Sequence, residues 1–354
     1  MCLSHRCRAR GRCHHARMHV TTRGPIDGAP VLLIHGNCSS SRYWEPLVRH
    51  LPESWRIVVP DLRGYGESEP APVDATGGLR DFSDDVAALL SDGSFAPDAR
   101  PVVVGHSMGG GVAIQLLIDR PADLAALVLE APVSPYGFGG TRDLDGTPTS
   151  PDFAGTGGGS VNPEFVKLLA AGDRSSDDPA SPRNVMRSMY VAAPDAFGED
   201  EEAMLDSLLS TVVGEDNYPG DGSTSANWPF TGPGRRGVLN TMSPRWLSLA
   251  GIVDVPTKPP ITWVRGDADA IVSDASFFDL AQLGKLGLVP GWPGDEACPP
   301  QPMVGQMRRV LDRYASAGGS YTEVVYEGCG HSPHIERTAE FAELLAGVVG
   351  KAIA

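Results

Sequence analysis

Short apolar runs alternate with amphipathic segments from residue 19 to residue 132 and again from about residue 259. The first five apolar runs are nearly continuous in Val, Ile and Leu, the pattern of strands buried on both faces of a parallel sheet. The predicted strands are VLLIHG (31–36), RIVVPD (56–61), PVVVGH (101–106), LAALVLEAP (124–132), ITWVRG (261–266) and YTEVVYEG (321–328). The amphipathic segments predict helices at 41–51, 79–91, 108–119, 273–286, 303–317 and 337–350.

This alternation predicts an α/β fold with a doubly wound, mostly parallel sheet and helices on both of its faces. Residues that carry chemistry are then expected on loops at the carboxyl ends of the strands. Two segments interrupt the alternation. Residues 134–256 are rich in Gly, Pro, Ser and Asp, yet they contain helical patterns at 163–172, 181–192 and 199–213.

A structureless loop as long as residues 134–256 is improbable inside a compact domain, so we predict an inserted, mainly helical lid subdomain packed over the strand ends. The core is then formed by residues 18–133 and 257–354. A shorter irregular insert, residues 286–302, separates two of the late helices.

The composition fits a soluble globular protein: 41% of the 354 residues are hydrophobic and 21% are charged. No run of 18 apolar residues occurs, which excludes a membrane-spanning helix. The formal net charge is -15, although residues 1–17 contain five arginines and no acidic residue. The remaining acidic surface disfavours nucleic acid and anionic membranes as partners but says nothing about the expected small-molecule substrate.

The N-terminal segment is unusual because residues 1–17 also hold Cys2, Cys7, Cys13 and the His14–His15 pair. These residues lack the spacing of a zinc site, so no metal is expected. The segment also lacks the apolar region of a secretion signal. We therefore expect a disordered leader or a mis-assigned start ahead of Met18, and a cytoplasmic location.

GHSMGG (105–110) matches the pattern G-x-S-x-G between a predicted strand and a predicted helix. Such a tight turn leaves the serine strained, with its hydroxyl exposed above the sheet, and the glycines allow close approach of the neighbouring backbone. Ser107 is therefore a candidate nucleophile. The alternative is a small polar residue in a glycine-lined turn, so the assignment depends on finding a base, an acid and an oxyanion site elsewhere.

The His-Gly turn after the strand at 31–36 is where donors to an oxyanion are expected. The backbone N–H of Asn37 is one candidate, and the N–H of Met108, at the start of the helix behind Ser107, is the other. His35 is expected to hold this turn in place rather than to act as a base.

A carboxylate and a histidine follow the last two predicted strands. Asp267 and Asp269 both come after the strand that ends at Gly266, and the pattern G-x-x-D-x-I-V favours Asp269 as the acid of a triad. His331 lies in a Gly-Cys-Gly turn after the final strand, where an imidazole can reach Ser107. His334 is expected to pack at the start of the last helix.

The order Ser107, Asp269, His331 along the chain resembles that of the α/β-hydrolase superfamily, with a lid as in esterases, lipases and C–C hydrolases. PDLRGYGES (60–68) adds the superfamily's D-x-R-G-x-G-x-S turn, and the resemblance covers residues 19–133 and 257–350. It implies a reaction without cofactor or metal. One departure is that such proteins begin with two antiparallel strands, whereas only residues 18–24 read plainly as a strand here.

The resemblance implies a serine hydrolase that cleaves a carboxylic ester or a lactone through an acyl-enzyme. Alternatives are an acyltransferase, a cofactor-free perhydrolase or haloperoxidase, and a ligand-binding protein with slow turnover. Aromatic residues of the lid favour a medium-sized, partly apolar substrate. The expected lining residues are Tyr136, Phe138 and Trp228, and Tyr190, Trp246 and Trp292 are further candidates.

Overall fold

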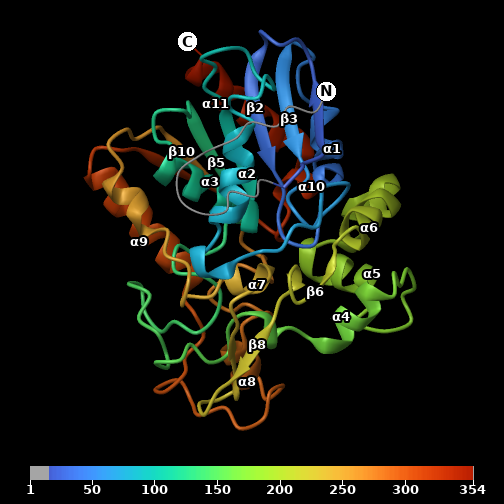
Figure 1. Ribbon diagram of the computed structural model, residues 1–354, viewed down its shortest axis with the longest axis vertical. Helices are drawn as coiled ribbons and strands as arrows, with labels where there is room; N and C mark the ends of the chain where they lie inside the picture. The colour runs from blue at the N-terminus through green and yellow to red at the C-terminus, as the bar shows by residue number, and fades with distance from the viewer. Residues whose placement is uncertain (1–15, 354) are drawn as a thin grey trace.

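A computed structural model of the protein describes residues 16–353, and its centre is a seven-stranded sheet (Figure 1). The strand order is β1-β3-β2-β4-β5-β10-β11. Only β1 is antiparallel to its neighbour, and the other paired strands are parallel. The strands are β1 Val20–Arg23, β2 Ala29–Ile34, β3 Trp55–Pro60, β4 Val102–His106, β5 Ala126–Glu130, β10 Ile261–Gly266 and β11 Tyr321–Tyr326.

Helices cover both faces of this sheet, as the alternating pattern predicts. They are α1 Glu45–Val48, α2 Arg80–Ala88, α3 Met108–Asp119, α9 Met303–Ser316, α10 Pro333–Glu336 and α11 Thr338–Ala352. The short helix α8 Leu280–Lys285 lies away from the sheet, at the bottom of Figure 1. Successive strand residues point to opposite faces. Leu32 and Val103 therefore pack in the cluster that holds residues of α2, α3 and α9, whereas Leu33 and Val104 pack in the cluster that holds residues of α1 and α11.

Two predicted helices are shorter than expected. Residues 41–51 form a 3-10 turn, Ser41–Trp44, followed by the single turn of α1. The prediction of a helix at 273–286 is wrong over its first half, because α8 begins only after Asp279, whose carboxylate accepts the N–H of Ala281. At the other end of the sheet, β1 is the one strand that precedes β2 in the described residues.

Residues 134–256 leave the core after β5 and lie at the carboxyl ends of the strands, in the lower half of Figure 1. They contain α4 Pro163–Ala170, α5 Pro182–Val185, α6 Glu201–Leu209, α7 Val238–Thr241 and a π-helical turn at Met186–Tyr190. They also contain two small sheets that the sequence did not predict. These pair β6 Val213–Gly214 with β7 Tyr218–Pro219, and β8 Gly222–Thr224 with β9 Thr231–Pro233.

Buried glutamines join the start of this insertion to α9. Gln306 accepts a hydrogen bond from the Ser134 hydroxyl at 2.6 Å and donates one to the Thr141 hydroxyl at 2.9 Å. Gln301 donates to the Gly137 carbonyl at 3.1 Å and to Gln306 at 2.7 Å. The insertion is therefore fixed to the second half of the core as well as to the first.

The leader expected at residues 1–17 lies almost wholly outside the described residues, and the cysteines and histidines named for it lie there too. Of its last two residues, Ala16 donates its N–H to Asp85 and Arg17 donates its N–H to Glu69. Within residues 16–353, none of the helices combines the length and the apolar character that crossing a bilayer requires.

Candidate active site

Ser107 stands at the turn between β4 and α3 with φ 56° and ψ -120°. A positive φ is unfavourable for a residue with a side chain, and such strain is typical of functional sites. The flanking glycines explain how the turn fits. A Cβ on Gly105 would overlap the backbone of Gly109, and a Cβ on Gly109 would overlap the carbonyl oxygens of Ile34 and His35. The G-x-S-x-G spacing thus lets α3 approach both β4 and the turn after β2.

His331 and Asp269 form a buried hydrogen-bonded pair. Nδ1 of His331 lies 2.8 Å from Oδ2 of Asp269, and both side chains are at most 3% exposed. The other carboxylate oxygen accepts the N–H groups of Ile271 and Val272 at 2.7 and 2.9 Å. Because both carboxylate oxygens act as acceptors, Nδ1 of His331 carries the proton and Nε2 is left as the basic nitrogen.

Asp267, the alternative acid, is exposed and is bonded elsewhere. Its Oδ1 accepts the N–H of Gly328 at 2.7 Å, in the turn that follows β11. Of the two carboxylates expected after β10, the structure therefore joins Asp269 to His331.

Ser107 and His331 lie in the wall of one small cavity of about 90 Å³. Core residues supply its polar wall, which also includes Asn37 and His106. The rest of the wall is apolar or aromatic and comes mainly from the insertion and from the loop after β10. These residues are Val133, Phe138, Tyr190, Leu239, Met242, Ile271, Val272 and Phe278. The cavity thus has a polar floor at the strand ends and an apolar cover.

The aromatic residues expected to line the site divide into two groups. Phe138 and Tyr190 are in the cavity wall. Tyr136 and Trp228 do not lie in this wall, which corrects the prediction that they line the site. The Tyr136 ring packs on Gly146, and the Trp228 indole donates to the Pro290 carbonyl at 2.9 Å, in the late insert. Tyr136 thus packs within the insertion, whereas Trp228 joins the insertion to the late insert.

His106 was not anticipated from the sequence as part of the site. Its Nε2 donates to the backbone carbonyl of His331 at 3.0 Å, and the two ring centroids are 4.8 Å apart. Burial lowers the pKa of His106 well below its usual value, and the neighbouring His331 lowers it further. A neutral His106 therefore connects the serine turn to the histidine loop. The one feature of the sequence that pointed to His106 is its position directly before Ser107 in the GHSMGG motif.

The turn after β2 approaches Ser107 closely. A Cβ on Gly36 would lie 2.9 Å from Cβ of Ser107. His35 holds this turn, because its Nε2 accepts the N–H of Leu62 at 2.9 Å and its Nδ1 donates to the Gly36 carbonyl at 2.8 Å. Burial lowers the pKa of His35, which keeps the ring neutral in this role. Asn37 follows directly and lines the cavity.

Met108 is the first residue of α3, so its backbone N–H has no acceptor within the helix. Its side chain is fully buried. The two N–H groups named as oxyanion donors therefore come from turns that meet at Ser107, one after β2 and one after β4.

His334 is fully buried beneath the site. Its Nδ1 is 2.9 Å from the Glu130 carboxylate and its Nε2 donates to the Tyr43 carbonyl at 3.1 Å. The backbone N–H of His334 also donates to Glu130 at 2.7 Å. His334 thus ties α10 to β5 and to the turn before α1.

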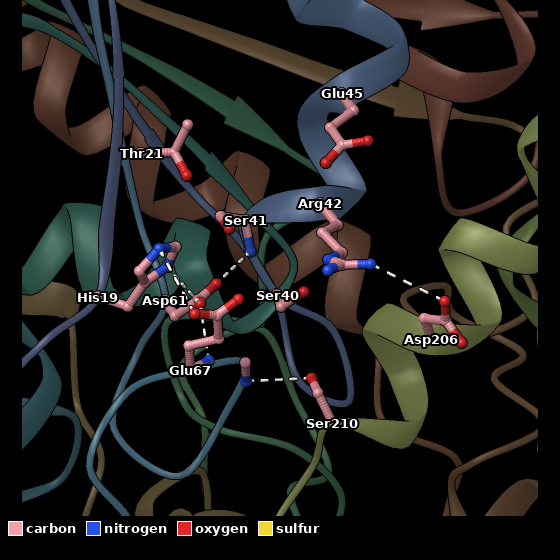
Figure 2. Close-up of a pocket in the computed structure, with 11 residues that line it drawn as sticks. His19, Thr21, Ser40, Ser41, Arg42, Glu45, Asp61, Glu67, Asp206 and Ser210 are labelled. Atoms are coloured by element: carbon pink, nitrogen blue, oxygen red, sulfur yellow. Dashed lines mark hydrogen bonds and ion pairs between the residues drawn. The ribbon is translucent and has the colours of Figure 1, made fainter.

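The D-x-R-G-x-G-x-S turn is held by Asp61, which accepts the N–H groups of Ser41 and Glu67 and contacts Nδ1 of His19 at 3.0 Å. Asp61 also lines a second, larger cavity of about 410 Å³, and Figure 2 shows it beside His19 and Glu67. The lining of that cavity includes neither Ser107 nor His331, so it is separate from the candidate active site.

The described residues contain no group of three or more His, Cys, Asp or Glu side chains arranged to hold a metal ion.

Comparison with known proteins agrees with this fold. A family model described as the alpha/beta hydrolase family matches residues 31–344. A lipase of Mycobacterium tuberculosis, LipV, is 40% identical over 140 residues, which cover 38% of this chain and 50% of the lipase. The chain thus spans half the length of this curated relative.

Solved structures share the fold over nearly the whole chain. An esterase of a Rhodococcus species, RhEst1, has a TM-score of 0.58 at 17% identity, with 95% of each chain covered. A bromoperoxidase of Bacillus anthracis has a TM-score of 0.59 at 18% identity, with 95% of this chain and 96% of the other covered. At these identities the likeness concerns the fold alone.

Proposed function

The chain belongs to the alpha/beta hydrolase family, and from that premise we propose that it is a serine hydrolase acting on carboxylic esters or lactones. The observation that carries the proposal is the His331–Asp269 hydrogen bond of 2.8 Å in the wall of the cavity that contains Ser107. LipV is named a lipase, which fits the same class of reaction.

In the proposed mechanism, Nε2 of His331 accepts the hydroxyl proton as Ser107 attacks the carbonyl carbon of the substrate. Asp269 keeps the other ring nitrogen protonated and stabilises the imidazolium that forms. The backbone N–H groups of Asn37 and Met108 stabilise the oxyanion. His331 then returns the proton to the leaving alcohol, and a water activated by the same nitrogen hydrolyses the acyl-enzyme.

The cavity favours a short, uncharged acyl group. None of the described residues that line it is Asp, Glu, Lys or Arg. Its volume of about 90 Å³ is below the range of roughly 300–1,000 Å³ typical of ligand sites. We therefore narrow the expected medium-sized substrate to one with a short acyl chain.

The test is covalent labelling by a fluorophosphonate, which reacts only with an activated serine. We expect labelling of the wild-type protein and its loss in Ser107→Ala and His331→Ala. Ser316→Ala is the matched control, since this exposed serine bonds only to a carbonyl in α9 and should leave labelling unchanged. Folded wild-type protein that does not label would refute the proposal. Product analysis with added alcohol or peroxide then separates hydrolysis from acyl transfer and perhydrolysis.

A further inference from the structure

The side-chain amide of Asn37 is held in one orientation at the wall of the candidate active site. The Tyr65 hydroxyl donates to its Oδ1 at 2.6 Å, and the Cys38 thiol contacts the same oxygen at 3.7 Å. Tyr65 is only 1% exposed, and burial raises its pKa well above the usual value, so the hydroxyl keeps its proton and remains a donor. Two donors therefore converge on the carbonyl end of the amide.

Because Oδ1 is occupied, Nδ2 of Asn37 is the end of the amide that remains for the cavity. None of the described residues provides a hydrogen-bond acceptor for it. The rest of the cavity wall combines polar groups of the site with apolar side chains such as Val133, Leu239 and Ile271. Asn37 is only partly buried, but a substrate that fills the cavity excludes water from it, and an N–H donor left without an acceptor there is then unfavourable.

The carbonyl oxygen of the substrate already has donors in the proposed mechanism, the backbone N–H groups of Asn37 and Met108. The side-chain amide is therefore available for a second oxygen of the substrate. The cavity is small, so this oxygen has to lie within a few bonds of the carbonyl carbon.

Resting on the proposed serine hydrolase function, we propose that the Asn37 side-chain amide donates to an oxygen on the carbon next to the substrate carbonyl. The site then selects esters of short 2-hydroxy or 2-alkoxy acids. Tyr65 is a positioning residue, which acts by holding Asn37. A site that hydrogen-bonds such an oxygen discriminates against an analogue that carries a methylene in its place.

The test compares two esters of the same shape, para-nitrophenyl methoxyacetate and para-nitrophenyl butyrate. The ratio of their kcat/KM values measures recognition of the oxygen and cancels effects common to both. Asn37→Ala keeps the backbone N–H but removes the amide, and we expect the ratio to fall at least tenfold, chiefly through KM for methoxyacetate. Equal losses on the two esters would overturn the proposal.

Tyr65→Phe should lower the same ratio in the wild-type background and leave it unchanged in the Asn37→Ala background, because Tyr65 acts through Asn37. An equal additional loss in both backgrounds would overturn the positioning role. Tyr314→Phe is the matched control, since this buried hydroxyl donates to the Pro259 carbonyl at 2.6 Å and should leave the ratio unchanged.

Fluorophosphonate labelling distinguishes a failure of the proposed selectivity from a failure of the proposed serine hydrolase function. Wild-type protein that labels at Ser107 but shows no change of ratio in Asn37→Ala overturns the selectivity alone. Folded protein that neither labels nor hydrolyses either ester overturns the serine hydrolase function itself.

Discussion

Replacing Asp269 by asparagine tests how the imidazole is oriented. Oδ1 of Asp269 accepts the N–H groups of Ile271 and Val272, and Oδ2 faces Nδ1 of His331. An asparagine keeps its oxygen on the two backbone donors, because an amide nitrogen there would face two N–H groups. Its own NH₂ then faces His331 and favours the tautomer with the proton on Nε2. That nitrogen can no longer accept the proton of Ser107.

We expect Asp269→Asn to lower kcat about 10³–10⁴-fold, equivalent to about 4–5.5 kcal/mol of transition-state stabilisation. The loss falls on kcat because the substrate contacts are retained. Hydrolysis of para-nitrophenyl butyrate gives kcat and KM directly. Asp267→Asn is the control, since its carboxylate bonds only the N–H of Gly328 at an exposed turn, and kcat should change less than about threefold. An Asp269 variant with more than a tenth of wild-type kcat, or a larger loss in the Asp267 variant, would refute the reasoning.

Three further perturbations test packing and charge around the site, each read from denaturant titration. Gly109→Ala places a methyl group against two backbone carbonyls and should lower the free energy of unfolding by about 1–3 kcal/mol. Gly350→Ala, with open space around it in α11, should raise that free energy by up to about 1 kcal/mol. A Gly109 variant more stable than the Gly350 variant would contradict the close approach of α3 to the turn after β2. Arg63→Ala removes the guanidinium that lies 2.6 Å from the buried Asp85 carboxylate and should cost about 3–5 kcal/mol, far more than Arg236→Ala in an exposed ion pair. Equal costs would be inconsistent with the burial of this pair. Burial depresses the pKa of His106 below its ordinary value of 6.5, so the unfolded chain binds a proton as the pH falls through 6.5 that the folded chain does not, and stability should decrease on acidification. His106→Gln should reduce that slope by up to about 1.4 kcal/mol per pH unit, and an unchanged slope would show that His106 does not contribute.

The sheet and the helices next to it were predictable because their signals are local. Strand–turn–helix patterning placed α3 at residues 108–119, and its bounds in the structure are Met108–Asp119. The helix expected at 273–286 failed over its first half, where other hydrogen bonds compete with it. Asp274 accepts the N–H of Val304 at the start of α9, and the Ser276 hydroxyl donates to the Ile271 carbonyl. Apolar spacing in one segment contains no information about such partners.

Some residues of the candidate site were also predictable from local signals, and others depend on contacts that the sequence does not show. Ser107, Asp269 and His331 follow strand ends, so their place in the chain was enough to bring them to one edge of the sheet. Trp228 was assigned by residue type alone, and its indole bonds to the late insert instead. Tyr65 stands between the two glycines of a motif that was interpreted only as a turn, and its contact with Asn37 is visible only in three dimensions.

The hydrogen bond from His106 to the His331 carbonyl also has a consequence for biosynthesis. Its two residues are 225 positions apart in the chain, although the rings nearly touch. At a synthesis rate of about 5–20 residues per second, the serine turn leaves the ribosome roughly 11–45 s before its base does. During that interval β4 and α3 can form, but the histidine proposed to activate the hydroxyl does not yet exist. On the proposed mechanism, the nascent chain cannot hydrolyse esters until residue 331 has been synthesised.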